Sequence, residues 1–248
     1  MLTFDIFSSL VHCKPYSAKL SAEFEFSEGK MKIVQTPVGN MEVFCYLVYD
    51  EQSNEGILID PAGDESRLLN LLKEAAVKLR YIVNTHGHAD HTCGNDYLRQ
   101  QTGAKVVMHA LDDEFFQQPE CRQWAEMMGF CAAKPADIQI RDGDELSFGS
   151  LAAKFIHTPG HTPGACCILI DGNLFTGDTL FVGAVGRTDL PGASFQQLLE
   201  SLKNKILPLP PETVVWPGHD YGDRPASTIK DETETNPYIT DFLLEDDE

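Results

Sequence analysis

Residues 85–91 read T-H-G-H-A-D-H and contain three imidazoles and one carboxylate within seven positions. Neutral imidazole and carboxylate are side chains that suit Zn²⁺ and Fe²⁺, and a ligand set that leaves positions open to water is typical of catalytic sites. A polar loop with ordinary histidines is the alternative interpretation. The density of ligands in so short a segment favours a metal site.

The flanking residues place this segment between a strand and a helix. Residues 81–84 (Y-I-V-N) form an apolar, partly β-branched run that predicts a buried strand, and a helix is expected from Asp90 to residue 101. Sheets in α/β proteins usually carry their sites at the carboxyl ends of strands. His86 and His88 can converge on one ion, whereas Asp90 and His91 point elsewhere and suit a second.

Three later segments each set one His or Asp in a glycine-rich turn after a hydrophobic strand. They are residues 158–164 (T-P-G-H-T-P-G), 175–181 (F-T-G-D-T-L-F) and 216–221 (W-P-G-H-D-Y). Together with the first segment they give the order H-x-H-x-D-H, H, D, H. This pattern covers nearly all of residues 32–220 and resembles the metallo-β-lactamase superfamily. The resemblance implies an α/β fold, a four-layered αββα sandwich.

The resemblance also assigns seven metal ligands. Those of the first ion are His86, His88 and His161. Those of the second ion are Asp90, His91 and His219, and Asp178 bridges both. Two divalent ions are expected, with zinc favoured and iron or manganese as alternatives. Water bound to zinc has its pKa lowered to about 7, so a hydroxide held between paired ions is a strong nucleophile at neutral pH. Asp90 is also expected to be catalytic, steering this hydroxide or taking up its proton.

The sequence after Asp178 narrows the resemblance. Residues 179–192 contain a glycine-rich run followed by G-R-T-D, which looks like the glyoxalase II-like branch, with its hydroxyacylglutathione hydrolases and persulfide dioxygenases. In that branch the basic residue after the run contacts a glutathione carboxylate, which implies that Arg187 binds substrate. The planar guanidinium suits this role because it binds both carboxylate oxygens. A surface arginine in a loop is the alternative.

The first hypothesis for function is a binuclear metallohydrolase that cleaves a thioester, of the hydroxyacylglutathione hydrolase type. The second is a mononuclear iron persulfide dioxygenase with ligands His86, His161 and Asp178, because two histidines and a carboxylate leave positions open for oxygen and sulfur. A non-catalytic metal-binding module is the third. A β-lactamase is disfavoured, because the best-known zinc lactamases have Cys as a second-site ligand where His91 stands here.

Composition restricts the partners. The chain has 248 residues, of which 42% are hydrophobic, enough for one large domain with a buried core. Its net charge is −19 and no basic stripe is present, which counts against nucleic-acid binding. No window approaches the roughly 18 apolar residues of a membrane-spanning helix, and residues 1–7 lack the cationic start of a signal peptide. The seven cysteines form no regular framework and indicate reduced thiols. A cytoplasmic protein without membrane contact is expected.

Domain boundaries follow from the same patterns. Residues 1–30 are interpreted as an N-terminal extension of uncertain structure, because they are serine-rich and fit the rest poorly. Residues 31–248 are expected to form a single metallo-β-lactamase-like domain with a short acidic C-terminal tail. A typical glyoxalase II has a long helical C-terminal domain that completes glutathione binding, and only residues 222–248 follow the last motif here. A short-form thioesterase that tolerates a wider range of substrates is therefore an equal expectation.

The expected partner is a small-molecule substrate, with a glutathione conjugate as a candidate. A homodimer is an option.

Hydrophobic periodicity predicts the elements that carry these motifs. Helices are expected at residues 64–79, with Asp64 as the cap, at 112–129 with a break at Pro119, and at 194–205 with Ser194 as the cap. Strands are expected at residues 32–35, 43–49, 56–59, 105–108, 138–140, 145–148, 151–156, 165–170, 173–175 and 214–216.

Overall fold

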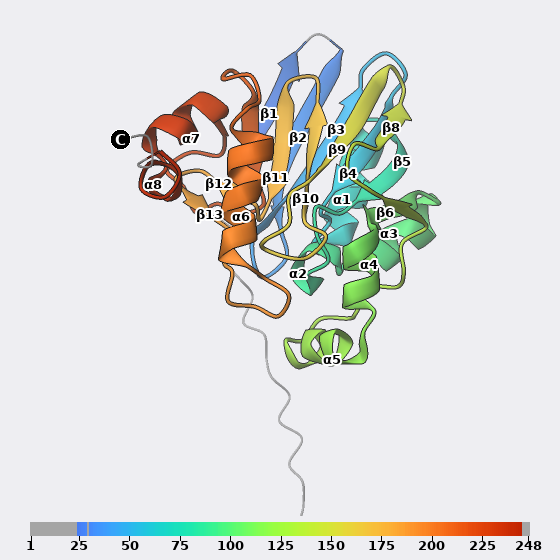
Figure 1. The fold of residues 1–248 in the computed structure, drawn as a ribbon. Coiled ribbons are helices and arrows are strands. Elements are labelled where there is room, and N and C mark those ends of the chain that lie inside the picture. Colours follow the sequence, from blue (N-terminus) through green and yellow to red (C-terminus); the bar gives the residue numbers. More distant parts are fainter. Residues whose placement is uncertain (1–23, 29, 245–248) are drawn as a thin grey trace, which may run out of the picture.

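Two β-sheets lie face to face in the computed structural model, which describes residues 24–28 and 30–244 (Figure 1). One sheet has seven strands in the order β1 to β7. The other has six strands in the order β15-β14-β11-β10-β9-β8. Helices cover the outer face of each sheet, so the expected four-layered αββα sandwich is confirmed.

The seven-stranded sheet follows the order of the chain. Its strands are β1 (Phe24–Glu28), β2 (Met31–Val38), β3 (Val43–Asp50), β4 (Glu55–Ile59), β5 (Lys78–Val83), β6 (Lys105–His109) and β7 (Ile138–Ile140). Strands β1 to β4 pair antiparallel, whereas β4 to β7 pair in parallel. Parallel strands need crossover connections, and the helices in these are α1 (Glu65–Glu74), α2 (Ala89–Thr92), α3 (Asn95–Thr102), α4 (Ala110–Phe116) and α5 (Pro119–Met127). The carboxyl ends of β4, β5 and β6 therefore share one edge.

The six-stranded sheet is mostly antiparallel. Its strands are β8 (Glu145–Phe148), β9 (Leu151–His157), β10 (Cys166–Ile170), β11 (Asn173–Gly177), β14 (Val214–Pro217) and β15 (Ser227–Thr228). Only β11 and β14 pair in parallel within it. A small hairpin of β12 (Leu180–Phe181) and β13 (Ala184–Val185) lies beside it, and its helical layer consists of α6 (Phe195–Ser201), the π-helical turn η1 (Leu202–Ile206), α7 (Ile229–Thr235) and α8 (Pro237–Thr240).

Strand β3 shows how the sequence specifies four layers. All of its residues are buried, and successive side chains point to opposite faces of the sheet. Tyr46 and Val48 pack into the core between the two sheets, whereas Cys45 and Leu47 pack beneath the helical layer that includes α1 and α3. A strand covered on both faces is apolar throughout, which explains why β3 shows no polar alternation.

The helix expected at residues 64–79 is shorter in the structure. α1 ends at Glu74, Ala76 adopts the left-handed conformation (φ 52°), and Leu79 lies on β5, paired with Gly56 of β4. Leucine spacing alone did not separate the helix from the strand that follows it. Asp64 holds the N-cap position, but its carboxylate accepts the backbone N–H of Gly39 (3.0 Å) and makes no cap hydrogen bond.

Two further helices are divided. The helix expected between residues 90 and 101 is split into α2 and α3 next to Gly94, where a Cβ atom would lie 2.2 Å from the carbonyl oxygen of Pro61. The helix expected at residues 194–205 is capped by Ser194, whose hydroxyl accepts the Gln197 N–H, and it continues from α6 into η1. The break expected at Pro119 is present, because this residue begins α5.

Residues 1–23 of the N-terminal extension lie outside the described residues, as do Gly29 and residues 245–248 of the acidic tail. The described part of the extension includes β1, which pairs antiparallel with β2. All six cysteines of the described residues are free thiols. Among the helices in that part of the chain, none is long and apolar enough to cross a membrane.

The hydroxyl of Tyr46 links the two sheets. It donates to the carbonyl oxygen of Pro217 (2.5 Å) on β14 and accepts a hydrogen bond from Gln35 (3.0 Å). We expect Tyr46→Phe to lower the free energy of unfolding by about 1–3 kcal/mol, because the carbonyl oxygen of Pro217 loses this donor and the Gln35 amide loses one of its two acceptors. Tyr49→Phe on the same strand removes a hydroxyl that makes no hydrogen bond to any described residue and is the matched control. Urea denaturation measures both, and equal losses would contradict this role of Tyr46.

Candidate metal centre

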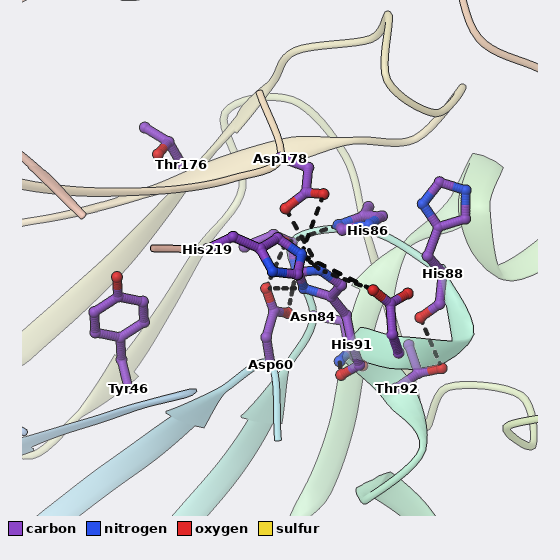
Figure 2. Close-up of polar contacts among 12 residues, drawn as sticks. Tyr46, Asp60, Asn84, His86, His88, His91, Thr92, Thr176, Asp178 and His219 are labelled. Carbon is purple, nitrogen blue, oxygen red and sulfur yellow. Dashed lines mark hydrogen bonds and ion pairs between the residues drawn. The ribbon is translucent and has the colours of Figure 1, made fainter. Parts of the chain in front are cut away.

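All seven predicted ligands lie at the edge of the sandwich where strands of both sheets end. The seven-stranded sheet supplies four of them, with His86 and His88 in the turn after β5 and Asp90 and His91 on α2. The six-stranded sheet supplies the other three from the loops after β9, β11 and β14, which carry His161, Asp178 and His219. Figure 2 shows Asp178 and Asp60 approaching the imidazoles from opposite sides.

The first ligand set consists of His86, His88 and His161, whose nearest ring nitrogens all lie within 4.8 Å of one another. His88 Nδ1 and His161 Nε2 face each other at 3.0 Å. The other nitrogen of His161, Nδ1, lies 2.8 Å from the carbonyl oxygen of Arg187 and donates to it, which leaves Nε2 as an acceptor. Two ligands of one tetrahedral zinc ion lie about 3.4 Å apart, so this spacing fits a shared ion.

The second ligand set consists of Asp90, His91 and His219, whose ligand atoms are equally close. His91 Nε2 lies 3.2 Å from His219 Nε2, and Asp90 Oδ2 lies 3.8 and 3.9 Å from these two nitrogens. The Nδ1 atom of His91 is occupied by the carboxylate of Asp60 at 3.0 Å. The ring therefore presents its Nε2 atom to the centre of the set.

Asp178 lies between the two ligand sets. Its Oδ1 is 3.4 Å from His91 Nε2, and its Oδ2 is 3.5 Å from His161 Nε2 and 3.6 Å from His219 Nε2. These distances are too long for hydrogen bonds with good geometry and suit atoms that share a cation. The position corresponds to the bridging role that the resemblance implies.

Unpartnered atoms test whether a metal fits. His86 Nε2 and Asp178 Oδ1 are buried and have no hydrogen-bond partner among the described residues. Leaving a buried polar atom without a partner costs about 1–3 kcal/mol, and more for a charged group. Divalent ions bound by the two sets would satisfy both atoms, so the donor set fits a pair of metal ions.

The two ligand sets differ in their electrostatics. Burial and the imidazole of His161 lower the pKa of His88 to about 3, and burial lowers that of His86 well below its ordinary value. For His91, burial lowers the pKa, but the carboxylates of Asp178, Asp90 and Asp60 more than reverse this and raise it to about 10. His86 and His88 of the first set are therefore neutral in the metal-free protein, whereas His91 of the second set holds a proton where a metal ion would bind.

Asp60 is a site residue that sequence analysis did not identify. Its carboxylate accepts hydrogen bonds from the backbone N–H of Thr85 (2.8 Å) and the Thr85 hydroxyl (2.6 Å), besides contacting His91. Asp60 follows β4, which pairs in parallel with β5, so it lies at the same sheet edge as the T-H-G-H-A-D-H turn. An acidic residue directly after the strand next to β5 was the signal that could have revealed it.

Arg187 is tied to the first ligand set by its main chain. Its side chain is 62% exposed and forms a bidentate ion pair with Asp189, with Nε to Oδ1 at 2.7 Å and a terminal nitrogen to Oδ2 at 2.8 Å. A substrate carboxylate that binds this guanidinium has to compete with Asp189.

Aromatic side chains surround the ligands. Phe116 of α4 lies edge-on to His88, with ring centroids 5.2 Å apart, and Trp124 of α5 lies 6.2 Å from the same ring. Tyr221 stacks on His219 at 5.0 Å and is 62% exposed. Figure 1 shows α5 extending away from the sandwich at the end where α2 lies. The segment expected at residues 112–129 therefore borders the candidate centre.

Comparisons with known proteins agree with this geometry. The family model described as the metallo-beta-lactamase superfamily matches residues 38–219, which include all seven ligands. The human mitochondrial persulfide dioxygenase ETHE1 is 35% identical over 201 residues, covering 79% of this chain and 71% of that protein. The hydroxyacylglutathione hydrolase GloC of Haemophilus influenzae is 32% identical over 213 residues, covering 84% of this chain and 98% of that protein.

A solved structure shares the fold at similar identity. The crystal structure of the B3 metallo-beta-lactamase BLEG-1 matches with a TM-score of 0.77 and 34% identity, covering 84% of this chain and 99% of that one. Its likeness reaches over both sheets rather than one motif. From the family match and the relatives, the chain belongs to the metallo-β-lactamase superfamily.

Proposed function

We propose that this protein is a binuclear metallohydrolase that cleaves a thioester of the hydroxyacylglutathione type. The observation that carries the proposal is the complete second ligand set, with Asp178 placed between it and the first. A mononuclear enzyme needs only three ligands, and a second metal ion would give Asp90, His91 and His219 a role, because they converge with 3.2 to 3.9 Å between their ligand atoms. Zinc is the proposed metal, and iron or manganese would suit the same nitrogen and oxygen donors.

Thioester hydrolysis adds water to the acyl carbon and breaks its bond to sulfur, which gives a carboxylic acid and a thiol. A bound pair of ions would supply an activated water and a Lewis acid for the carbonyl oxygen. Asp90 is the residue proposed to orient this water and take up its proton, because its carboxylate borders the second set and its side chain is 20% exposed. Asp60 and the carbonyl of Arg187 hold the rings of His91 and His161 in place.

A persulfide dioxygenase is the second candidate function. The 35% identity to a persulfide dioxygenase favours it, and its three expected ligands, His86, His161 and Asp178, lie in the same cluster. The likeness to a B3 lactamase at 34% identity also weakens the argument that a missing cysteine ligand excludes β-lactam cleavage. The substrates to compare are therefore a glutathione thioester, glutathione persulfide and a β-lactam.

His219→Ala separates the two main candidates. This change removes a ligand of the second set and none of the three that a mononuclear dioxygenase would use. We expect the zinc-loaded protein to cleave S-lactoylglutathione and the His219→Ala protein to fall to the rate of metal-stripped protein. Asp178→Ala is the matched control, because it removes a ligand from both candidate enzymes. Iron-loaded protein is assayed in parallel for oxygen uptake with glutathione persulfide. Oxygen uptake that survives His219→Ala, with no thioester cleavage, would establish the dioxygenase instead.

The raised pKa of His91 predicts proton release on metal binding. At pH values below its pKa of about 10, the His91 ring is protonated in the metal-free protein. An imidazole that binds a metal is deprotonated at the binding nitrogen. Zinc binding to the second set at pH 7.5 should therefore release about one proton from His91, and this release should disappear above about pH 10. Calorimetry in buffers of different ionisation enthalpy measures it in a His161→Ala background. When zinc binds the first set in a His219→Ala background, no proton should be released from His86 or His88. Proton release on binding to the first set and none on binding to the second would refute the assignment of the proton to His91.

Arg187 is proposed to bind an anionic group of the substrate. A charge-assisted hydrogen bond contributes about 1.5–3 kcal/mol, so Arg187→Ala should raise KM for an anionic thioester about tenfold or more. A neutral thioester should be cleaved with little change. Arg80→Ala is the control, because Arg80 is a partly exposed arginine paired with Glu55 at the start of β4. An equal rise in KM for both thioesters would remove Arg187 from substrate recognition.

A further inference from the structure

Helix α4 directs two residues of one face at the loops that carry the first ligand set. Asp112 and Phe116 are four positions apart and therefore lie on the same side of the helix. Asp112 is completely buried, and none of the candidate reaction steps uses it. A buried carboxylate is costly unless it is hydrogen-bonded, so its partners indicate what it does.

The carboxylate of Asp112 joins the two loops. Its Oδ2 accepts the backbone N–H of Gly87 (2.8 Å) and the hydroxyl of Thr162 (2.7 Å), and its Oδ1 accepts the backbone N–H of Gly164 (2.5 Å). Gly87 stands between His86 and His88, and Thr162 follows His161. One side chain thus contacts residues adjacent to all three ligands of the first set.

The loops joined in this way belong to different sheets. The Gly87 loop follows β5 of the seven-stranded sheet, and the Thr162 loop follows β9 of the six-stranded sheet. The backbone N–H of Cys166 also donates to the carbonyl oxygen of Thr85 (2.8 Å) and links the two sheets here. That bond lies before His86 in one loop and after Gly164 at the end of the other, so it does not join the segments that carry the ligands. The spacing of 3.0 Å between His88 Nδ1 and His161 Nε2 has to be maintained across this junction.

The glycines of both motifs make room for α4. A Cβ atom at Gly87 would lie 2.1 Å from the ring of Phe116, and one at Gly164 would lie 2.5 Å from the backbone nitrogen of Asp112. Both loops therefore fit against α4 only with glycine at these positions. The motif glycines that sequence analysis assigned to turns also serve this close packing.

We infer that Asp112 is a positioning residue that holds the two loops of the first ligand set at the spacing a metal ion requires. The inference rests on the metal centre and not on which substrate is cleaved. Partners that hold metal ligands in place typically contribute 10–100-fold to metal affinity. Asp112 would act on the first set alone, because its hydrogen bonds reach no residue that carries the second.

Asp112→Asn tests this role. The amide keeps one acceptor oxygen and turns the other into a donor, which then faces a backbone N–H, so one loop loses its link. We expect the zinc dissociation constant of the first set to rise about 10–100-fold, measured by competition with a chromophoric chelator in a His219→Ala background. The second set, measured in a His161→Ala background, should be unchanged. A selective loss at one set distinguishes positioning from general destabilisation.

Asp113→Asn is the matched control. Asp113 is the next residue on α4 and is also buried. Its carboxylate accepts hydrogen bonds from the backbone N–H of Ala136 (2.9 Å) and the side-chain amide of Gln139 (2.7 Å), and neither residue lies in a loop that holds a candidate metal ligand. It should leave zinc affinity at both sets unchanged. An unchanged first set in Asp112→Asn protein with a native circular dichroism spectrum would overturn the inference, and so would an equal loss in Asp113→Asn protein.

A milder variant covers the case in which Asp112→Asn does not fold. Thr162→Val removes one of the three hydrogen bonds and leaves the carboxylate with two backbone donors. It should raise the zinc dissociation constant of the first set over wild type, by less than the 10–100-fold expected for Asp112→Asn, and an unchanged affinity would overturn the inference. Wild-type protein that binds zinc at both sets but cleaves no thioester would refute the proposed function and leave this inference intact.

Discussion

Buried polar atoms at the junction of the two sheets are the constraint on which the rest of the structure depends. Five imidazoles and the carboxylate of Asp178 meet there with little solvent contact, and His86 Nε2 and Asp178 Oδ1 have no hydrogen-bond partner among the described residues. Such atoms are costly unless a cation or a proton satisfies them. The sandwich supplies the stability that allows this cluster to persist, because three apolar layers lie beneath and beside it.

Close backbone approach brings the loops of the two sheets together. Phe44 of β3 donates its N–H to the carbonyl oxygen of Gly218 (2.8 Å), and a Cβ atom at Gly218 would lie 2.4 Å from Asp178 Oδ1. At Gly177 the backbone is left-handed (φ 49°), and a Cβ atom would lie 2.2 Å from the Thr85 hydroxyl. Gly177 is therefore required by a contact across the junction, and Gly218 by the close approach of Asp178 within the same sheet.

The sequence predicted the elements and a cluster of candidate ligands, but not the contacts that hold these side chains in place. Residues 138–140 and 145–148 were predicted as strands and form strands, because a strand with one buried face alternates between apolar and polar residues along the sequence. Hydrophobic periodicity does not report the roles of Asp60 and Asp112, since each accepts hydrogen bonds from a loop at least 25 positions away. The end of α1 was missed for a related reason, because the pairing of Leu79 with β4 overrides the helical spacing of the leucines before it. Arg187 was predicted from a motif, but its pairing with Asp189 depends on side-chain geometry that the motif does not encode.

The distribution of charge differs between the two ligand sets. The first ligand set has three imidazoles, two of which are kept neutral by burial and neighbouring rings. The second set includes the carboxylate of Asp90, receives Asp178 as a neighbour, and has Asp60 behind His91. Three carboxylates around one ring raise its pKa to about 10 and attract any cation that displaces the proton. A cation at the second set is therefore attracted by all three carboxylates around His91. Asp178 lies within 3.6 Å of ring nitrogens of both sets, so a charge placed in one set acts on the other through this shared carboxylate.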